Sequence, residues 1–124
     1  MTNIQLKALR QLLFYTVDEA AELVAASPGR PGGVTGRTWR HWEDGRNPVP
    51  EHVASMILGY ARWRQQQIDN FPAMQISPAL TWYDTPEEWA TVNLIAPLWR
   101  PHQSALAHLA ATVPGVSLVA YKPA

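Results

Sequence analysis

VTGRTWRHWEDGRNPVP, residues 34–50, predicts one short helix around which the chain is organised. Thr35 can accept a hydrogen bond from a free amide of the first turn, which is the role of an N-cap residue. Gly45 can adopt the left-handed conformation that ends a helix. Pro48 and Pro50 follow at positions where the helix has already closed. The stretch therefore predicts a helix with a defined beginning and end.

The side chains of this helix separate into two faces. One face holds the residues that we expect to contact a core: Val34, Thr38 or Trp39, and Trp42. The other face presents the residues that we expect to be exposed: Gly36, Arg37, Arg40 and His41. Arginine can make a bidentate contact to guanine O6 and N7 in the major groove, and histidine can donate to bases or phosphates. A solvated amphipathic helix is the alternative, and it would be favoured for an isolated Arg-x-x-Arg pair.

A second helix is predicted immediately upstream, within residues 16–24, TVDEAAELV. Thr16 and Glu19 have the spacing of a capping box, and the acidic first turn suits the positive end of the helix dipole. Ala20 and Ala21 are small, so another helix can approach closely. A helix with small residues followed by a helix that displays basic residues is the helix-turn-helix arrangement.

These two segments together resemble the Cro/C1-type (xenobiotic-response-element, XRE) helix-turn-helix. More narrowly, the whole chain resembles the YdiL-like family, which includes anti-CRISPR-associated autorepressors. The likeness covers the first half well and the C-terminal half more loosely, where it includes a Trp-Arg-x-x-Gln-Ser pattern, here Trp99, Arg100, Gln103 and Ser104. The resemblance implies DNA binding and a C-terminal half that pairs two subunits.

Two features depart from the usual motif. Residues 25–33, AASPGRPGG, lengthen the connection between the helices by about six or seven residues, which adds little closure entropy. We expect this loop to be mobile. Val17 stands where Cro/C1 relatives often have a glutamine that contacts phosphate. Arg30 could supply that contact, although a solvated loop is the simpler interpretation.

Composition limits the class of protein. The 124 residues are 47% apolar, which is enough for a core, and none is cysteine, which excludes disulfides and thiolate metal sites. Neither an apolar run of about 18 residues nor a secretory signal is evident, so we expect a cytoplasmic protein of a bacterium or phage. The formal net charge is +0, which alone argues against nucleic-acid binding. Residues 30–46 nevertheless hold more arginines than acids, and therefore form a local basic patch.

Two further helices are expected to complete an N-terminal four-helix bundle. A capping box at Thr2 opens a helix to about Phe14, whose apolar stripe consists of Leu6, Leu9 and Leu13 with Leu12 beside them. Lys7 and Arg10 of this helix could lie near a DNA backbone or on a solvated face. Pro50 opens a helix that could run to Ile68.

The remainder predicts a small α/β region. Residues 70–79 contain two prolines and indicate an irregular connection, and residues 80–83 favour a short strand. A short helix follows Thr85. A longer one begins at Arg100, with these residues facing a core: Ala105, Leu106, Leu109, Ala110 and Val113. Residues 116–121 form the last predicted strand. The predicted fold is therefore mainly α (α+β), with a helix-turn-helix DNA-binding domain at 1–68 and a C-terminal dimerisation region at 69–124.

No catalytic pattern is apparent. His102 and His108 have no carboxylate cluster with them, which makes a metal site improbable. Ser104 could be imagined beside a histidine and Asp84, but it lacks the strained turn of a nucleophile. A glycine-rich phosphate loop is also missing. We therefore expect no enzyme, no metal and no cofactor.

The sequence thus predicts a transcriptional repressor that binds double-stranded DNA as a homodimer, on an inverted repeat in a promoter. The predicted DNA-binding residues are Thr35, Gly36, Arg37, Thr38, Arg40, His41, Arg46 and Asn47. Trp39 and Trp42 are assigned to the core because aromatic rings dominate the packing of small domains. Two alternatives use the same residues differently. They are an antitoxin-like module that binds a protein, and a regulator that binds RNA.

Overall fold

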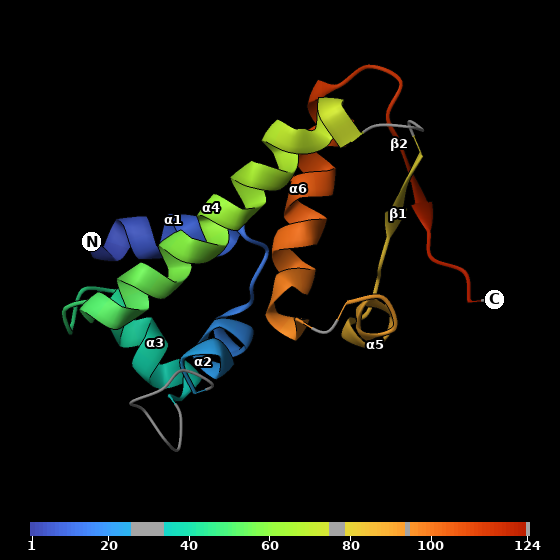
Figure 1. Cartoon of the computed structure of the whole chain (residues 1–124). Coiled ribbons are helices and arrows are strands. Elements are labelled where there is room, and N and C mark those ends of the chain that lie inside the picture. The colour runs from blue at the N-terminus through green and yellow to red at the C-terminus, as the bar shows by residue number, and fades with distance from the viewer. Residues whose placement is uncertain (26–33, 75–78, 94, 124) are drawn as a thin grey trace. The chain divides into compact units, whose positions relative to one another are not determined.

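Helices dominate the computed structural model, which describes residues 1–25, 34–74, 79–93 and 95–123. These residues contain six α-helices, one 3-10 helix and a two-stranded parallel sheet near the C-terminus (Figure 1). The chain divides into two compact units, Met1–Ala61 and Arg62–Ala124. The predicted mainly helical class is confirmed, and so is the presence of a small strand region.

The elements follow the predicted order closely. The helices of the first part of the chain are α1 (Asn3–Leu12), α2 (Val17–Ala25), α3 (Gly36–Glu43) and α4 (Glu51–Met74), and α4 continues into the second unit. The remaining elements are β1 (Ala79–Trp82), α5 (Pro86–Ala90), the 3-10 helix η1 (Ala96–Leu98), α6 (Trp99–Thr112) and β2 (Ser117–Ala120).

Threonine caps define where the helices begin. Thr2 and Gln5 exchange both bonds of a capping box before α1, with N···O distances of 2.9 and 3.1 Å. Thr16 and Glu19 do the same before α2, at 2.9 and 3.1 Å. Thr35 accepts from the first turn of α3. These hydrogen bonds confirm the predicted caps. The caps could be predicted because each depends only on residues three positions apart.

The core of the first unit is apolar and includes two tryptophans. Its buried members are Leu6, Leu13, Tyr15, Ala20, Ala21, Val24, Trp39, Trp42, Val53 and Ile57. The rings of Trp39 and Trp42 meet edge to face with centroids 5.6 Å apart. Burial, with smaller contributions from Tyr60 and Glu19, raises the pKa of Tyr15, so its phenol stays neutral. Both tryptophans are core residues, as predicted.

Leu12 does not belong to the apolar stripe of α1, because its side chain is 40% exposed. Leu6, Leu9 and Leu13 follow the helical spacing of one face. Leu12 precedes Leu13 by a single residue and therefore points about 100° away from it. The prediction that placed Leu12 with the stripe was wrong in this respect.

α4 is longer than predicted. It continues through residues 70–74, where we expected an irregular connection, and it ends at Met74 rather than near Ile68. Proline lacks the amide that bonds to the preceding turn. At Pro72, two residues before the end of α4, this omission removes little of the helical bonding. The proline was therefore a poor indicator of the helix end.

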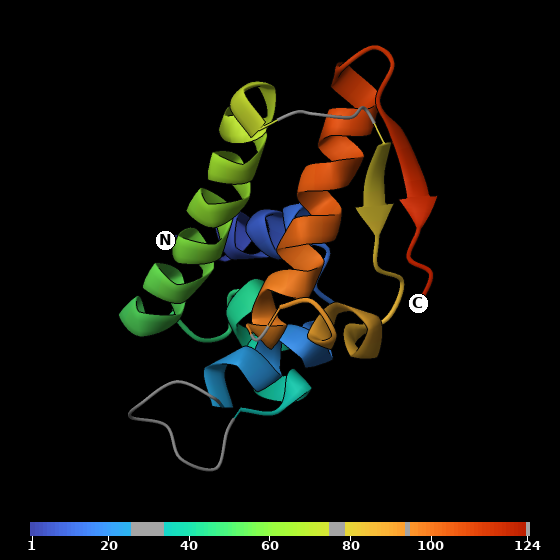
Figure 2. The ribbon, with the colours of Figure 1, turned by 45° about the vertical axis from the view of Figure 1, so that its right-hand side comes forward.

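In the second unit, β1 and β2 pair in parallel, from Ala79 opposite Ser117 to Trp82 opposite Ala120. Figure 2 shows the two strands side by side with α6 next to them. Parallel strands need a long crossover, and α5, η1 and α6 form it here. Ala105, Leu106 and Leu109 of α6 are buried as predicted, whereas Ala110 is exposed and was wrongly assigned to the core.

The Trp-Arg-x-x-Gln-Ser pattern connects these elements. Trp99 Nε1 and Gln103 Nε2 both donate to the carbonyl oxygen of Tyr83, at 2.7 and 3.0 Å. Arg64 of α4 donates from Nε to the Ser104 hydroxyl at 2.7 Å. The pattern therefore ties α6 to the chain just after β1 and to the C-terminal part of α4.

His102 lies in an aromatic cluster of the second unit. Its ring centroid is 4.7 Å from that of Trp89 and 5.8 Å from that of Tyr83. Its Nδ1 is buried and has no hydrogen-bond partner among the described residues. Burial penalises the charged imidazolium and lowers the pKa of His102 to about 4.

Ala25, the first residue of the loop that we predicted to be mobile at residues 25–33, is instead the last residue of α2. Residues 26–33, and with them Arg30, lie outside the described residues. Within the described ranges, no helix combines the length and apolar character needed to cross a membrane.

The environment of His102 predicts an acid-dependent loss of stability. Because folding lowers the pKa from 6.5 to about 4, the neutral ring is favoured in the folded state and the stability it contributes is complete above pH 6.5. This contribution should fall as the pH drops from 6.5 towards 4, by about 2–3 kcal/mol. Urea unfolding at several pH values would measure it.

His102→Phe should remove that part of the pH dependence, because phenylalanine fills the site without titrating. The exposed His108→Gln serves as the control and should follow the wild-type curve. Parallel stability curves for the wild type and His102→Phe would contradict this account.

Candidate nucleic-acid interface

α3 separates its buried and exposed side chains cleanly. Trp39 is fully buried and Trp42 is nearly so. Arg37 and Arg40 are exposed, as is the N-cap Thr35. Thr35 Oγ1 accepts from the backbone amide of Thr38 at 3.2 Å. The helix thus presents arginines to solvent on a surface that the two indoles hold in place.

The predicted site residues of intermediate exposure are Gly36, Thr38 and His41. They lie along α3 between the exposed arginines and the buried tryptophans. Thr38 also lies within hydrogen-bond distance of Thr35 through its hydroxyl, at 3.2 Å. These residues can contact a ligand at the helix surface, but their side chains are shorter than those of the arginines.

The chain turns sharply after α3. Gly45 has a φ of +85°, as expected for a residue that ends a helix. The Asn47 amide returns to the His41 carbonyl at 3.1 Å. Arg46 Nη1 lies 3.4 Å from His41 Nε2. The turn therefore brings Arg46 and Asn47 back beside the end of the helix, and both are exposed.

Arg46 also forms an ion pair with Asp44, with Nε 3.3 Å from Oδ2 and side chains that are 69% and 43% exposed. Exposed pairs of this kind contribute little to stability and are screened by salt. Arg46 can therefore exchange Asp44 for another anion at small cost.

An ion pair between α1 and α3 was missed from the sequence. Arg10 donates from Nε and Nη2 to the two carboxylate oxygens of Glu43, at 2.6 and 3.0 Å. The Arg10 and Glu43 side chains are only 12% and 8% exposed. Trp39 Nε1 also donates to Glu43, and Arg10 Nη1 donates to the Tyr15 carbonyl at 3.1 Å. Arg10 is therefore neither a solvated residue nor one available to a DNA backbone.

A signal for this pair was present in the sequence. Arg10 follows Leu6 by four residues and precedes Leu13 by three, which places it on the core-facing stripe of α1. A charge at such a position needs a partner. Glu43 follows Trp39 by four residues and thus shares its side of α3.

The pair alters the local charge balance. In the net charge of residues 30–46, the two carboxylates of Glu43 and Asp44 offset two of the arginines. Glu43 is satisfied by Arg10 from outside that stretch, and Asp44 is paired with Arg46. Arg37 and Arg40 therefore dominate the exposed charge of α3.

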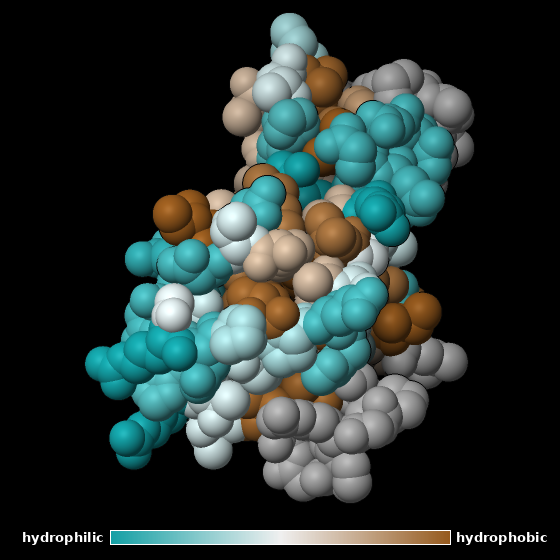
Figure 3. Space-filling model, turned by 90° about the vertical axis from the view of Figure 1, so that its left-hand side faces the viewer, coloured by the Kyte–Doolittle hydropathy of each residue, from teal (hydrophilic) through white to brown (hydrophobic). Residues whose placement is uncertain are grey.

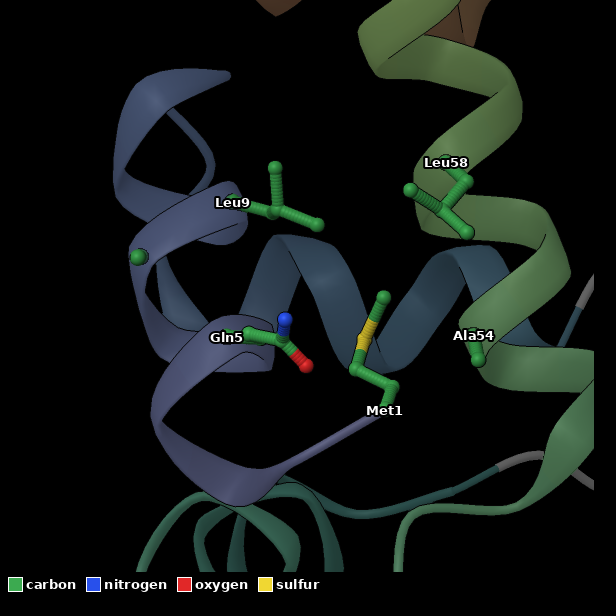
Figure 4. Close-up of a pocket in the computed structure, with 6 residues that line it drawn as sticks. Met1, Gln5, Leu9, Ala54 and Leu58 are labelled. Carbon is green, nitrogen blue, oxygen red and sulfur yellow. The ribbon is translucent and has the colours of Figure 1, made fainter.

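Two surface hollows of the first unit are lined by residues that the structure describes. One, of about 300 Å³, is lined by Lys7, Arg40, Glu43 and Asp44. The other, of about 450 Å³, lies between α1 and α4. Figure 4 shows the side chains of Gln5 and Leu9 on one side, those of Ala54 and Leu58 on the other, and Met1 between them. The residues that line the larger hollow have no titratable side chain.

On the face drawn in Figure 3, hydrophobic residues form separate patches among hydrophilic ones, as is usual for protein surfaces. In the part of the chain that the structure describes, no three His, Cys, Asp or Glu side chains gather so that they could hold a metal ion.

Comparison with known proteins gives the family. A family model described as Aca2/YdiL-like matches residues 1–116. The chain belongs to the Aca2/YdiL-like family. Among its relatives, the Aca2 repressor of Pectobacterium phage ZF40 is 36% identical over 96 residues, which cover 75% of this chain and 77% of the relative. The uncharacterized protein YdiL of Escherichia coli (strain K12) is 28% identical over 68 residues, or 55% of this chain and 52% of YdiL.

Removing one partner of the Arg10–Glu43 pair should destabilise this family member strongly. Glu43→Gln would leave the poorly exposed Arg10 guanidinium without a counter-charge, and we expect a loss of about 3–5 kcal/mol. Chemical denaturation would measure it. Asp44→Asn is the matched control, because its pair is exposed, and it should change stability by less than about 1 kcal/mol.

Replacing both partners, as Arg10→Met with Glu43→Leu, should recover part of the loss, since no buried charge then remains. If Glu43→Gln and Asp44→Asn lower the free energy of unfolding equally, the pair between α1 and α3 contributes no more to stability than the exposed pair.

Proposed function

We propose that this chain is a transcriptional repressor that binds operator DNA through α3 as a homodimer. The observation that carries the proposal is the division of α3, which buries Trp39 and Trp42 and exposes Arg37 and Arg40. The name of its relative in phage ZF40, Aca2 repressor, supports the same function. α2 and α3, which pack against each other, would be the two helices of the helix-turn-helix.

In this proposal the residues of α3 have distinct roles. Arg37 and Arg40 read base edges in the major groove, where bidentate arginine contacts select guanine. Thr35 and the amide end of α3 bind a phosphate, which helix N-termini favour. Phosphate contacts set position, and base contacts set sequence preference.

The remaining predicted residues line the edges of the contact. Gly36 has no side chain, so the DNA can approach the first turn of α3 closely. Thr38 and His41 lie beside the arginines. Arg46 and Asn47 hold the backbone of the DNA after the turn, which the exposed position of both side chains allows. A regulator of this kind catalyses no reaction and needs no cofactor.

Duplex DNA is favoured over RNA because the deep, narrow major groove of A-form RNA does not admit side chains on a helix. A shift assay with the duplex upstream of the chain's own gene, run beside RNA of the same sequence, would test this. A pull-down would test the antitoxin-like alternative. Saturable binding to the duplex in preference to RNA supports the proposal, and binding to a protein partner alone refutes it.

Arg37→Ala should weaken binding to the selected duplex by about 1–3 kcal/mol and relax preference at one base pair. Its melting temperature should hardly change, because the side chain is exposed. Trp39→Ala should act mainly on stability instead, with a loss of roughly 3–5 kcal/mol in the free energy of unfolding. Binding titrations and thermal unfolding would measure the two quantities.

Arg62→Ala, which removes an exposed arginine of α4, is the charge-matched control and should retain sequence preference. If Arg37→Ala unfolds the chain, or binds like the wild type, the assignment of faces is incorrect.

We also propose that residues from about 65 onward form most of a two-fold dimer interface. Large apolar side chains of the second unit are exposed, with Val92, Ile95 and Val119 at 52%, 56% and 46%. A two-fold protein predicts an inverted repeat with half-site centres one helical turn apart, roughly 34–36 Å, or a multiple of it. Light scattering should find a dimer for the full chain and a monomer for a chain shortened after Arg64.

Two isoleucines give a matched comparison in the full chain. Ile95→Lys should shift the chain towards monomer, whereas Ile4→Lys, at a residue that is 73% exposed in the first unit, should not. A wild type that is monomeric at micromolar concentration, or a dimer that is lost only on Ile4→Lys, would contradict an interface formed by residues from about 65 onward.

A further inference from the structure

Arg64, a residue of α4 in the second unit, is a buried cation. It is only 8% exposed, and its Nε donates to the Ser104 hydroxyl of α6 at 2.7 Å. A hydroxyl carries no formal charge, so this bond satisfies one guanidinium donor and leaves the positive charge uncompensated. Arginine is rarely buried to this extent unless an acidic group is paired with it.

No acidic side chain of the chain compensates that charge. All ten Asp and Glu residues lie in the ranges that the structure describes. Among these residues, the ion pairs of Glu43 and Asp44 are made with Arg10 and Arg46, and none joins a carboxylate to Arg64. Burial lowers the pKa of Arg64, as expected for a cation that has lost hydration without gaining a counter-charge. Such a loss of hydration is costly for an unpaired charge.

The rest of the guanidinium remains accessible. No hydrogen bond to a described residue uses Nη1 or Nη2 of Arg64. The fully enclosed polar atoms that lack a partner in the described part of the chain are Glu88 Oε2 and His102 Nδ1, so neither Nη atom is enclosed. Both Nη groups can therefore donate to an anion that arrives from outside the chain.

We propose that Arg64 and Ser104 form an anion site of the second unit, which takes a carboxylate that this chain does not itself supply to it. The planar guanidinium matches the two oxygens of a carboxylate, and such charge-assisted pairs are stronger than neutral hydrogen bonds. The bond from Nε to Ser104 restrains the guanidinium plane before the anion arrives.

Two sources offer the same chemistry, a free small carboxylate and an acidic side chain of a second copy. The second source rests on the proposed dimer, because a two-fold interface lets each copy supply a guanidinium and receive a carboxylate. Asp69, Asp84 and Glu87 are exposed in the second unit, and none of them forms an ion pair with a described residue. The first source is independent of any dimer.

Arg64→Met tests the second source, because it keeps an unbranched apolar stem and removes the charge. If a second copy supplies the carboxylate, the dissociation constant of the dimer should rise about thirtyfold or more, as for the loss of one partner of a buried charge pair. Analytical ultracentrifugation of the full chain would measure it. Arg62→Met is the matched control, because Arg62 is an exposed arginine of the same helix, and it should leave the constant unchanged.

The partner's carboxylate can then be identified. One of Asp69→Asn, Asp84→Asn and Glu87→Gln should weaken the dimer as Arg64→Met does. In an Arg64→Met background, that same change should have no further effect, since two residues that act through one contact are not additive.

Sodium formate tests the free source, in place of sodium chloride at constant ionic strength. The Nε–Hε resonance of Arg64 in the full chain should shift saturably with formate. The melting temperature of the wild type should rise with it, because a ligand that binds the folded state stabilises that state, and that of Arg64→Met should not. Glu88→Gln, which removes a partly enclosed carboxylate of the same unit, is the control and should respond to formate as the wild type does.

The outcomes separate the two sources and the proposed function. A dimer weakened by Arg64→Met but not by Arg62→Met supports a carboxylate from the second copy. An unchanged dimer with a saturable formate response supports a small-molecule carboxylate. A monomeric wild type that still binds formate refutes the proposed dimer and supports the site.

The site is overturned if the wild type and Arg64→Met have the same dimer affinity and the same response to formate. If Arg64→Met does not fold, Arg64→Lys takes its place, because lysine keeps the charge but lacks the planar fork. It should weaken whichever of the two responses the wild type shows, and an undiminished response would equally overturn the site.

Discussion

The ion pair between Arg10 and Glu43 is the constraint on which the placement of α3 depends. α3 has eight residues, too few to be stable as an isolated helix. It must therefore be held by tertiary contacts, and the Glu43 carboxylate provides one by accepting two hydrogen bonds from Arg10 of α1. Within α3, the same carboxylate also accepts from Trp39.

Such a pair fixes direction more than it adds stability. A buried ion pair must overcome the loss of hydration of both charges, whereas the apolar contacts of Trp39 and Trp42 favour burial at nearly any rotation that covers them. The two hydrogen bonds between Arg10 and Glu43, at 2.6 and 3.0 Å, are directional. They select one rotation of α3 about its axis. The exposed side of that rotation is the one that carries Arg37 and Arg40.

What the sequence reveals depends on how far apart the interacting residues are. Thr2, Thr16 and Thr35 act on amides within the next turn, so their caps could be predicted from local spacing. Arg10 and Glu43 are separated by 33 residues, and the sequence shows only that a charge interrupts an apolar stripe. The partner follows from the packing of α1 against α3, which no local pattern contains.

In the second unit, the Trp-Arg-x-x-Gln-Ser pattern supports the fold. Trp99 and Gln103 are buried and spend their donors on one carbonyl, that of Tyr83, and Ser104 accepts from Arg64. These polar side chains therefore make their hydrogen bonds within the second unit. These hydrogen bonds anchor α6 to the chain just beyond β1. Ile95 and Val119 differ from these residues because they are apolar and exposed, and they would be buried only in the proposed dimer.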